Sequence, residues 1–251
     1  MDHNTPPLPP DRRRLLGADI ADMLLGAECA GCGAVTTSLC TTCRAQLRPD
    51  PVCVRTPDGL PVHAGLRYEG VVAQVVRDIK EHGRTSLLPA LVPAMRAAAD
   101  ACLAARLPGA DPVDVVVPVP TAHASFRRRG FRLPELLARR TGGQVRRILT
   151  PTRRVRDQRG LGRAQRRSNV AGSMSARRGG DGWSVLVVDD VVTTGATLDE
   201  AARALGAAGF RVVGGVALAA TPPGAGLART GSADDAHRAG AGGGDTRASG
   251  W

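Results

Sequence analysis

The spacing of apolar residues predicts alternating strands and helices through the middle of the chain. Apolar and polar residues partly alternate over residues 62–69, which indicates a strand, and apolar residues recur at helical spacing over 71–80. Alternation of strands with helices is typical of an α/β fold with a mostly parallel sheet flanked by helices. Later segments continue the pattern, with a helix over 87–107, a short buried strand over 114–120 and a helix over 133–140.

The most informative pattern joins an apolar run, two adjacent acids and a turn that opens a helix. Residues 185–188 are all apolar, as in a strand covered on both faces, and we expect this strand to end at Asp189 and Asp190. Thr197 and Glu200 have the spacing of a capping box, and apolar residues then recur at helical spacing. A helix is therefore predicted to begin at the turn after the two acids.

This segment has the chemistry of a ribose-phosphate site. The first backbone N–H groups of a helix are unpaired and carry partial positive charge, so residues 193–197 suit a phosphate dianion. Asp189 and Asp190 would repel phosphate but suit sugar hydroxyls or Mg²⁺. An ordinary strand-to-helix turn with acidic caps is the alternative. The chain has neither a GxxxxGKS/T phosphate loop nor a GxGxxG motif after a strand, which excludes two other nucleotide sites.

Positive charge is concentrated in one part of the chain. The whole chain has a formal net charge of +11, whereas residues 127–178 hold 17 arginines and two acids, a net charge of +15 that leaves −4 elsewhere. Such a segment suits a polyphosphate ligand, because guanidinium groups bind phosphate in bidentate fashion, or a nucleic-acid backbone. A solvated surface is the third interpretation. Within the segment, residues 153–167 are predicted to form a mobile loop that closes over a ligand.

Four cysteines near the N-terminus predict a metal site. They form two CxxC pairs separated by seven residues, and thiolates at this spacing suit tetrahedral Zn²⁺ in a structural role with no open position for catalysis. Redox use of one CxxC pair is the alternative. The two other cysteines, Cys53 and Cys102, are expected to be ordinary buried or half-buried thiols. The predicted metal ligands are Cys29, Cys32, Cys40 and Cys43.

Composition divides the chain into four predicted segments. Residues 1–14 hold four prolines and three arginines, and residues 221–251 are rich in Gly, Ala and Ser, so both tails are predicted to be disordered. Between them we expect a small zinc module over 15–60 and an α/β domain over 61–220. No apolar run reaches the ~18 residues that span a membrane, and the basic N-terminus lacks the apolar core of a signal peptide. We therefore predict a cytoplasmic protein without membrane insertion.

Residues 185–198 alone resemble the motif by which type I phosphoribosyltransferases bind phosphoribosyl pyrophosphate (PRPP). Further motifs, in order across residues 20–220, are the four-cysteine module, Ile79-Lys80-(x)2-Gly83, Val117-Pro118-Val119-Pro120, Arg129-Gly130-Phe131, Gln158 and Arg167-Ser168-Asn169-Val170. Together these motifs resemble the ComF family, whose members have a phosphoribosyltransferase-like domain and are associated with competence and DNA uptake. The family usually has Asn-Gln where this chain has Arg132 and Leu133, so the resemblance does not carry over the polar contacts of those two side chains.

The resemblance implies a type I phosphoribosyltransferase-like sheet and a role for each matched residue. Asp189 and Asp190 would bind the ribose hydroxyls of PRPP, and Mg²⁺ would bridge those hydroxyls and the pyrophosphate. Lys80, Arg127 and Arg129 would bind the pyrophosphate. The 5′-phosphate would lie against Thr193, Thr194, Gly195, Ala196 and Thr197.

Three functions are compatible with this sequence. The first is transfer of the phosphoribosyl group to an unidentified acceptor. The second is a non-catalytic competence factor that binds single-stranded DNA beside a helicase, although only 2% of the residues are aromatic and single-strand binders usually stack bases on aromatic rings. The third is a regulator that responds to PRPP without turnover.

Overall fold

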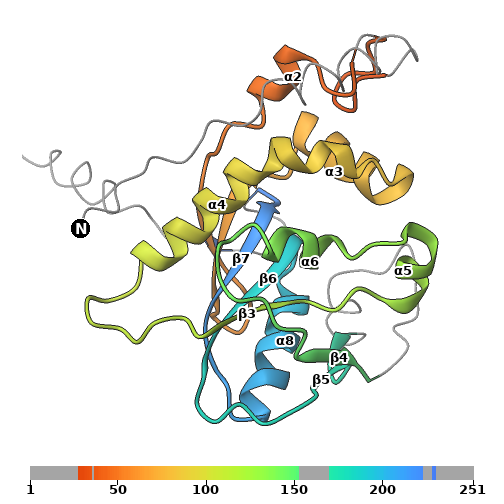
Figure 1. Cartoon of the computed structure of the whole chain (residues 1–251). Coiled ribbons are helices and arrows are strands. Elements are labelled where there is room, and N and C mark those ends of the chain that lie inside the picture. The colour runs from red at the N-terminus through yellow and green to blue at the C-terminus, as the bar shows by residue number, and fades with distance from the viewer. Residues whose placement is uncertain (1–27, 36, 153–169, 223–227, 230–251) are drawn as a thin grey trace, which may run out of the picture.

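A mostly parallel sheet organises the computed structural model, which describes residues 28–35, 37–152, 170–222 and 228–229 (Figure 1). The strands β3, β6, β7 and β2 are parallel to one another, whereas at one edge β1 pairs antiparallel with β2, and β8 pairs antiparallel with β1. In spatial order the six strands are β3 (Val115–Pro118), β6 (Ser184–Val192), β7 (Arg211–Ala220), β2 (Pro61–Arg67), β1 (Val52–Arg55) and β8 (Ala228–Arg229).

Helices cover both faces of this sheet. One hydrophobic cluster joins the sheet to α3 (Gly70–His82), α4 (Leu88–Ala104) and α6 (Leu133–Ala138), and a second joins it to α8 (Ala196–Ala207). Alternate side chains of β6 enter the two clusters, as strand geometry requires. The predicted α/β class is therefore confirmed. The remaining elements are α2 (Thr41–Ala45), the 3₁₀ helix η1 (Thr85–Leu87), α5 (His123–Arg129) and a two-stranded sheet of β4 (Leu149–Pro151) and β5 (Met174–Ala176).

The carboxyl ends of the parallel strands form the end of the sheet where ligands usually bind in α/β proteins. Ala220 at the end of β7 pairs with Val192 of β6 on one side and with Arg67 of β2 on the other. The chain leaves β2 into α3 and leaves β6 into the turn before α8. The helix α3 and the turn before α8 both contain residues that the sequence marked as ligand-binding. They therefore follow β2 and β6, the two strands that flank β7, at the same end of the sheet.

The helix begins at the predicted turn, but the predicted strand end and helix cap are wrong. β6 does not end at Asp189 and Asp190 but continues to Val192, because β7 extends alongside it and pairs with Asp189, Val191 and Val192. α8 begins at Ala196 behind the N-cap Gly195, and it has no side-chain cap. Nor is there a capping box: the carboxylate of Glu200 instead accepts the backbone N–H of Met174 and pairs with Arg203.

The sequence did not predict that any helix would be long and apolar enough to cross a membrane. By length and composition Thr85–Ala104 could cross a membrane, although the apolar runs of the sequence suggested no such segment. It packs instead as a core helix: Leu91, Met95 and Cys102 of α4 are buried in the cluster that joins α4 to the sheet. This packing is what the core helix of a soluble α/β protein shows.

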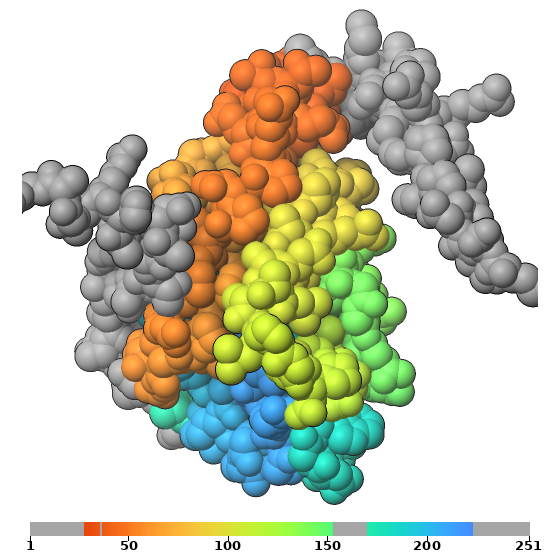
Figure 2. All heavy atoms as spheres, turned by 90° about the vertical axis from the view of Figure 1, so that its left-hand side faces the viewer, coloured from red at the N-terminus to blue at the C-terminus, as the bar shows by residue number. Residues whose placement is uncertain are grey.

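The cysteine-containing segment forms one end of the molecule. In the space-filling view, residues 28–50 form a cap at the top, directly above the segment that contains α3 and α4 (Figure 2). Leu39 and Leu47 of this segment are buried in the same hydrophobic cluster as α3 and α4. β1 falls within the range 15–60 predicted for the cysteine module, yet it is hydrogen-bonded to β2 as part of the main sheet.

Candidate functional site

An ion pair joins two segments that are far apart in the sequence. Lys80, in the last turn of α3, places Nζ 2.7 Å from Oδ1 of Asp190 in β6, and the two residues are 110 positions apart. The Lys80 side chain is 24% exposed and that of Asp190 only 14%. Partial burial strengthens such a pair relative to one in water, while solvent can still reach it. The structure thus brings together two of the residues predicted to bind PRPP.

Asp189 has the most perturbed carboxyl group of the site. Its Oδ1 accepts the backbone N–H of Asp190 at 2.7 Å. Burial and, to a lesser degree, the neighbouring Asp190 charge raise the pKa of Asp189 to about 7 against the opposing effects of the Asp190 N–H and Lys80. The carboxyl group therefore exchanges its proton near neutral pH. An added cation or hydroxyl donor at this point would favour the carboxylate.

The turn between β6 and α8 is held rigidly from two sides. Gly195 has φ +78°, and a Cβ there would lie 2.8 Å from the Cβ and Cγ2 atoms of Thr56. Only glycine fits, because the conformation is left-handed and the neighbouring chain leaves no room for a side chain. From the other side, Oγ1 of Thr221 donates to the carbonyl of Thr193 at 3.2 Å.

This rigid turn leaves backbone donors at the start of α8. Thr193, Thr194 and Thr197 are half-buried, whereas Gly195 and Ala196 are buried. The N–H of Ala196 makes only a long contact, 3.5 Å, with Oγ1 of Thr194. A helix start with weakly engaged N–H groups has the donors and the partial positive charge that a phosphate group requires. The predicted phosphate turn therefore directly follows β6, the strand that carries Asp189 and Asp190.

The residues that support the turn were missed in the sequence. Thr56 and Pro57 lie in the connection between β1 and β2 and pack against Gly195. In the same connection, the backbone N–H of Asp58 donates to Oδ2 of Asp199 in the first turn of α8 at 3.3 Å. No local sequence signal identifies these contacts, because they depend on how two distant segments pack.

The two predicted arginines lie on α5, which contacts α3. Arg127 is exposed and Arg129 is half-buried, and in the described residues the buried Nε atom of Arg129 has no hydrogen-bond partner. Neither arginine takes part in the ion pair of Lys80 with Asp190. The predicted loop over residues 153–167 lies outside the described residues.

The residues that depart from the ComF pattern have structural surroundings of their own. The guanidinium group of Arg132 lies over the ring of Phe126, 3.8 Å from its centroid, as in a cation–π contact. Leu133 is buried in the hydrophobic core. Both side chains therefore pack against apolar groups instead of presenting an amide to a ligand.

Part of the chain matches known proteins. Residues 113–232 match the family model of the phosphoribosyl transferase domain. The chain contains a phosphoribosyltransferase domain. A stretch of 34 residues is also 65% identical to adenine phosphoribosyltransferases of Rhodococcus opacus (strain B4) and Rhodococcus jostii (strain RHA1). That stretch covers 14% of this chain and 19% of each relative, so the chain matches about a fifth of their length.

Only part of the candidate site lies within the range that matches the family model. Asp189, Asp190 and the turn before α8 lie within the phosphoribosyltransferase range, whereas Lys80 and the four cysteines precede it. Lys80 nevertheless meets Asp190 directly. The structure thus adds to the phosphoribosyltransferase domain a cationic residue from α3, which precedes the matched range.

The four cysteines ahead of the phosphoribosyltransferase range form one cluster. Their Sγ atoms all lie within 4.8 Å of one another, and those of Cys32 and Cys40 are 3.9 Å apart. Tetrahedral Zn²⁺ with Zn–S bonds of ~2.3 Å requires S–S distances of about 3.8 Å. Gly31 permits the close approach, since a Cβ there would lie 2.7 Å from Sγ of Cys43. The cluster therefore has the geometry of a four-coordinate metal site.

The surroundings of the cluster favour thiolates unequally. Burial alone would raise the pKa of Cys29, but backbone N–H groups, including that of Cys40 at 3.4 Å, stabilise its thiolate and lower the pKa to about 6. Burial and the neighbouring thiols raise the pKa of Cys43. A metal ion would remove this conflict by balancing the negative charges. Cys53 is half-buried and Cys102 is buried, as expected for ordinary thiols.

Proposed function

We propose that this protein binds PRPP with Mg²⁺ at the Lys80–Asp190 site and transfers the phosphoribosyl group to an acceptor that is still to be identified. The observation that carries the proposal is the 2.7 Å ion pair between Lys80 and Asp190. Asp190 lies near the end of β6, and the turn that begins α8 with its backbone donors follows that strand. A cation, two carboxylates and a helix start in one place match the three chemical parts of PRPP, namely pyrophosphate, ribose hydroxyls and 5′-phosphate.

Each part of the ligand would meet a group of suitable charge. Asp189 and Asp190 accept hydrogen bonds from the ribose 2′- and 3′-hydroxyls, and the backbone N–H groups at Gly195 to Thr197 hold the 5′-phosphate. Lys80 exchanges its contact with Asp190 for the pyrophosphate, together with Arg127 and Arg129 of α5. This arrangement keeps the carboxylates away from the phosphate groups, which they would otherwise repel.

The reaction that follows from these contacts is a displacement at the ribose carbon C1. The bond between C1 and the pyrophosphate oxygen breaks, pyrophosphate leaves with the electron pair, and a lone pair of the acceptor forms the new bond to C1. Mg²⁺, when bound, would neutralise the charge that develops on the pyrophosphate. The protein's own part is to hold the ribose and both phosphate ends in position and to supply cations, since no protein nucleophile is needed.

The test is calorimetry with PRPP and Mg²⁺, followed by an assay of pyrophosphate release with a panel of nucleobases and amines. Binding with release establishes a transferase. Binding without release favours the regulator that responds to PRPP, and absence of binding to the wild-type protein contradicts the proposal.

For the cysteine cluster we propose structural Zn²⁺ held by Cys29, Cys32, Cys40 and Cys43. Four cysteine sulfurs within 4.8 Å of one another support a four-coordinate ion, and Zn²⁺ with four protein ligands has no position open for a substrate. Metal analysis of the purified protein should find one zinc per chain.

The resemblance to ComF proteins supports a second candidate function, in competence and DNA uptake. Arg127 and Arg128 on α5 are exposed and belong to the arginine-rich segment, so they are available to phosphate groups of single-stranded DNA. A titration with labelled single-stranded DNA at several salt concentrations tests this. Affinity that falls steeply with salt, and less steeply in an Arg127→Ala/Arg128→Ala variant, would favour DNA handling. We further propose that the protein is cytoplasmic and that, in this second function, it acts beside a helicase.

A further inference from the structure

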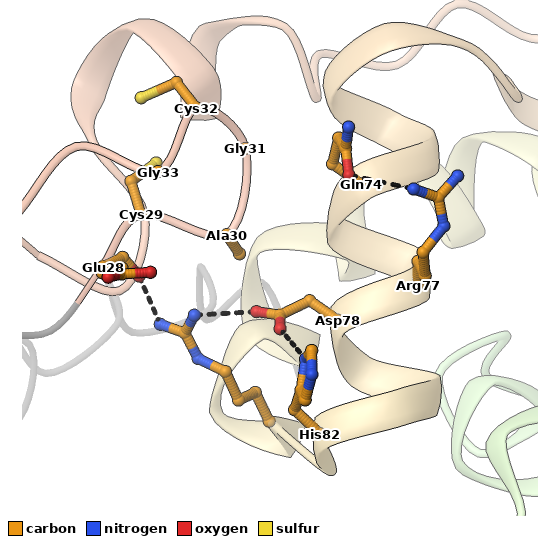
Figure 3. Close-up of a pocket in the computed structure, with 11 residues that line it drawn as sticks. Glu28, Cys29, Ala30, Gly31, Cys32, Gly33, Gln74, Arg77, Asp78 and His82 are labelled. Atoms are coloured by element: carbon orange, nitrogen blue, oxygen red, sulfur yellow. Dashed lines mark hydrogen bonds and ion pairs between the residues drawn. The ribbon is translucent and has the colours of Figure 1, made fainter.

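A cavity lies between the first CxxC pair and the polar face of α3. Its volume is about 360 Å³, and Figure 3 shows the CxxC backbone on one side and the polar side chains of α3 on the other. Both groups come together around Asp78, whose two carboxylate oxygens bind different partners. The residues that line the cavity are Glu28, Cys29, Ala30, Gly31, Cys32, Gly33, Gln74, Arg77, Asp78, His82 and Arg84.

Arg84 links the two sides of this cavity. Its Nη1 donates to Oδ2 of Asp78 at 2.7 Å, and its Nη2 donates to the carbonyl oxygens of Glu28 at 2.9 Å and Ser38 at 3.3 Å. The guanidinium group thus binds the backbone just before each CxxC pair, and at the same time it binds Asp78 in the last turns of α3. Asp78 is also fixed by His82, whose Nδ1 lies 2.6 Å from its Oδ1. The side chains of Arg84 and Asp78 are 27% and 14% exposed, so solvent screens their ion pair only in part.

Three consecutive residues of α3 face three different surroundings. Asp78 binds Arg84 at the cysteine module, Ile79 is fully buried in the core, and Lys80 binds Asp190 at the PRPP site. Positions two apart on a helix are rotated by about 200°, so Asp78 and Lys80 lie on nearly opposite sides of the helix. A rotation or shift of this turn that follows the loss of one contact must therefore move the other.

A second contact supports the same connection. A Cβ at Gly31 in the first CxxC would lie 2.9 Å from Cγ1 of Val71, so the knuckle touches the first turn of α3 as well as its end. Cys29 and Cys43 are buried in the same hydrophobic cluster as Val75 and Ile79 of this helix. The cysteine module therefore packs along α3.

We propose that Arg84 is a positioning residue for the PRPP site: by tying the cysteine module to Asp78, it fixes the C-terminal turn of α3 and so the placement of Lys80 against Asp190. The inference rests on the proposed function, because Lys80 matters only if the site binds a phosphorylated ligand. It gives the cysteine module a role in ligand binding without any contact with the ligand. A misplacement of about 1 Å in a positioning group is enough to weaken binding of a transition state or a charged ligand.

The first part of the test is hydrogen exchange in the full-length, zinc-loaded protein without ligand. Arg84→Ala should accelerate exchange of the amides at residues 79–83 about tenfold, because the tie that holds this turn is lost. Arg77→Ala is the matched control: Arg77 lies on α3 and lines the same cavity, but among the described residues its guanidinium group donates to Gln74 and not to Asp78 or the cysteine module. It should leave these amides unchanged. Unchanged exchange in Arg84→Ala would overturn the proposed tie.

The second part is PRPP–Mg²⁺ affinity in a double-mutant cycle. Arg84→Ala should weaken binding about tenfold in the wild-type background and have almost no further effect in Lys80→Ala, because it acts through Lys80. Asp78→Asn, which keeps the shape of the side chain and tests the same tie, should reproduce the effect, with zinc content measured in each variant. Equal losses from Arg84→Ala in both backgrounds would mean a general structural effect and would overturn the positioning role.

The wild-type protein separates the two proposals. If it binds no PRPP, the proposed function fails, and the positioning role fails with it. If the wild-type protein binds PRPP and Arg84→Ala binds it equally well, the proposed function stands and the role of Arg84 alone is refuted.

Discussion

Lys80 Nζ lies 2.7 Å from Oδ1 of Asp190, and this contact joins the end of α3 to the strand that carries both acids of the site. Without ligand, each residue neutralises the other. A ligand that carries both hydroxyls and phosphates satisfies both residues separately, with its hydroxyls on the carboxylate and its phosphates on the amine. On the proposed function, such a ligand would replace the contact between Lys80 and Asp190.

Removal of either partner should weaken PRPP–Mg²⁺ binding for different reasons. Lys80→Met keeps the length of the side chain but loses the cation for pyrophosphate, and Asp190→Asn loses an acceptor for a ribose hydroxyl. We expect each to reduce affinity at least about tenfold, the cost of one charged hydrogen bond. Calorimetry measures this, with Arg77→Met as a control for loss of a cation elsewhere on α3. Zinc content should stay unchanged in all three variants, and wild-type affinity in Lys80→Met would contradict the assignment.

Asp189 should make stability depend on pH. Its pKa is raised to about 7 by burial and by Asp190, so between pH ~4 and ~7 the folded protein holds a proton that the unfolded chain has lost. Stability from this group is thus greatest at low pH and falls as the pH rises to about 7. Asp189→Asn removes the penalty and should be more stable than wild type at pH 8 by about 2 kcal/mol, less than the full shift implies because the carboxyl group is partly exposed.

Urea unfolding of both proteins at pH 5 and pH 8, at matched zinc content, checks this prediction. The stability difference between Asp189→Asn and wild type should be larger at pH 8 than at pH 5. A difference that is the same at both values would show that the carboxyl group titrates normally in the folded protein.

Gly195 and Gly206 offer a matched pair of substitutions in one element. Gly195→Ala places a Cβ 2.8 Å from Thr56 in a left-handed conformation, so it should cost about 2–4 kcal/mol of stability and abolish PRPP binding. Gly206, near the other end of α8, has open space around it, and Gly206→Ala should be neutral or stabilise by up to about 1 kcal/mol. Thermal unfolding and calorimetry measure both effects. Normal PRPP binding by a folded Gly195→Ala protein would argue against a phosphate at this turn.

Local patterns in the sequence predicted the acids and the turn, but not how they are held. Asp189 and Asp190 stand out because charge follows an apolar run, a signal contained in a few residues. The contact of Thr56 with Gly195 has no such signal, because it arises when the β1–β2 connection packs on α8. Lys80 was assigned to the site only by its charge and by resemblance to a family, and its contact with Asp190 was not predicted, since the two residues are 110 positions apart.

The two errors in the motif segment have the same cause. The strand was expected to end at its acids, yet β7 provides partners for three residues beyond Val188 of β6, so pairing outweighs the polar side chains. The capping box failed because Glu200 finds a buried N–H at Met174 and a cation at Arg203, both more favourable than the helix end. Tertiary partners decided both the end of β6 and the role of Glu200, and the local sequence does not contain those partners.

Loss of one cysteine should separate a zinc site from a redox site. Cys32 is the exposed member of the cluster, so Cys32→Ser removes a metal ligand with little loss of packing. Zinc content should fall well below one per chain, and unfolding stability should drop by several kcal/mol, less than the ~10–16 kcal/mol that zinc supplies to isolated zinc-finger peptides, because the module also packs on α3. Cys53→Ser, outside the cluster, is the control and should retain its zinc. A wild-type protein that contains no zinc but forms a disulfide within a CxxC pair would instead support redox use.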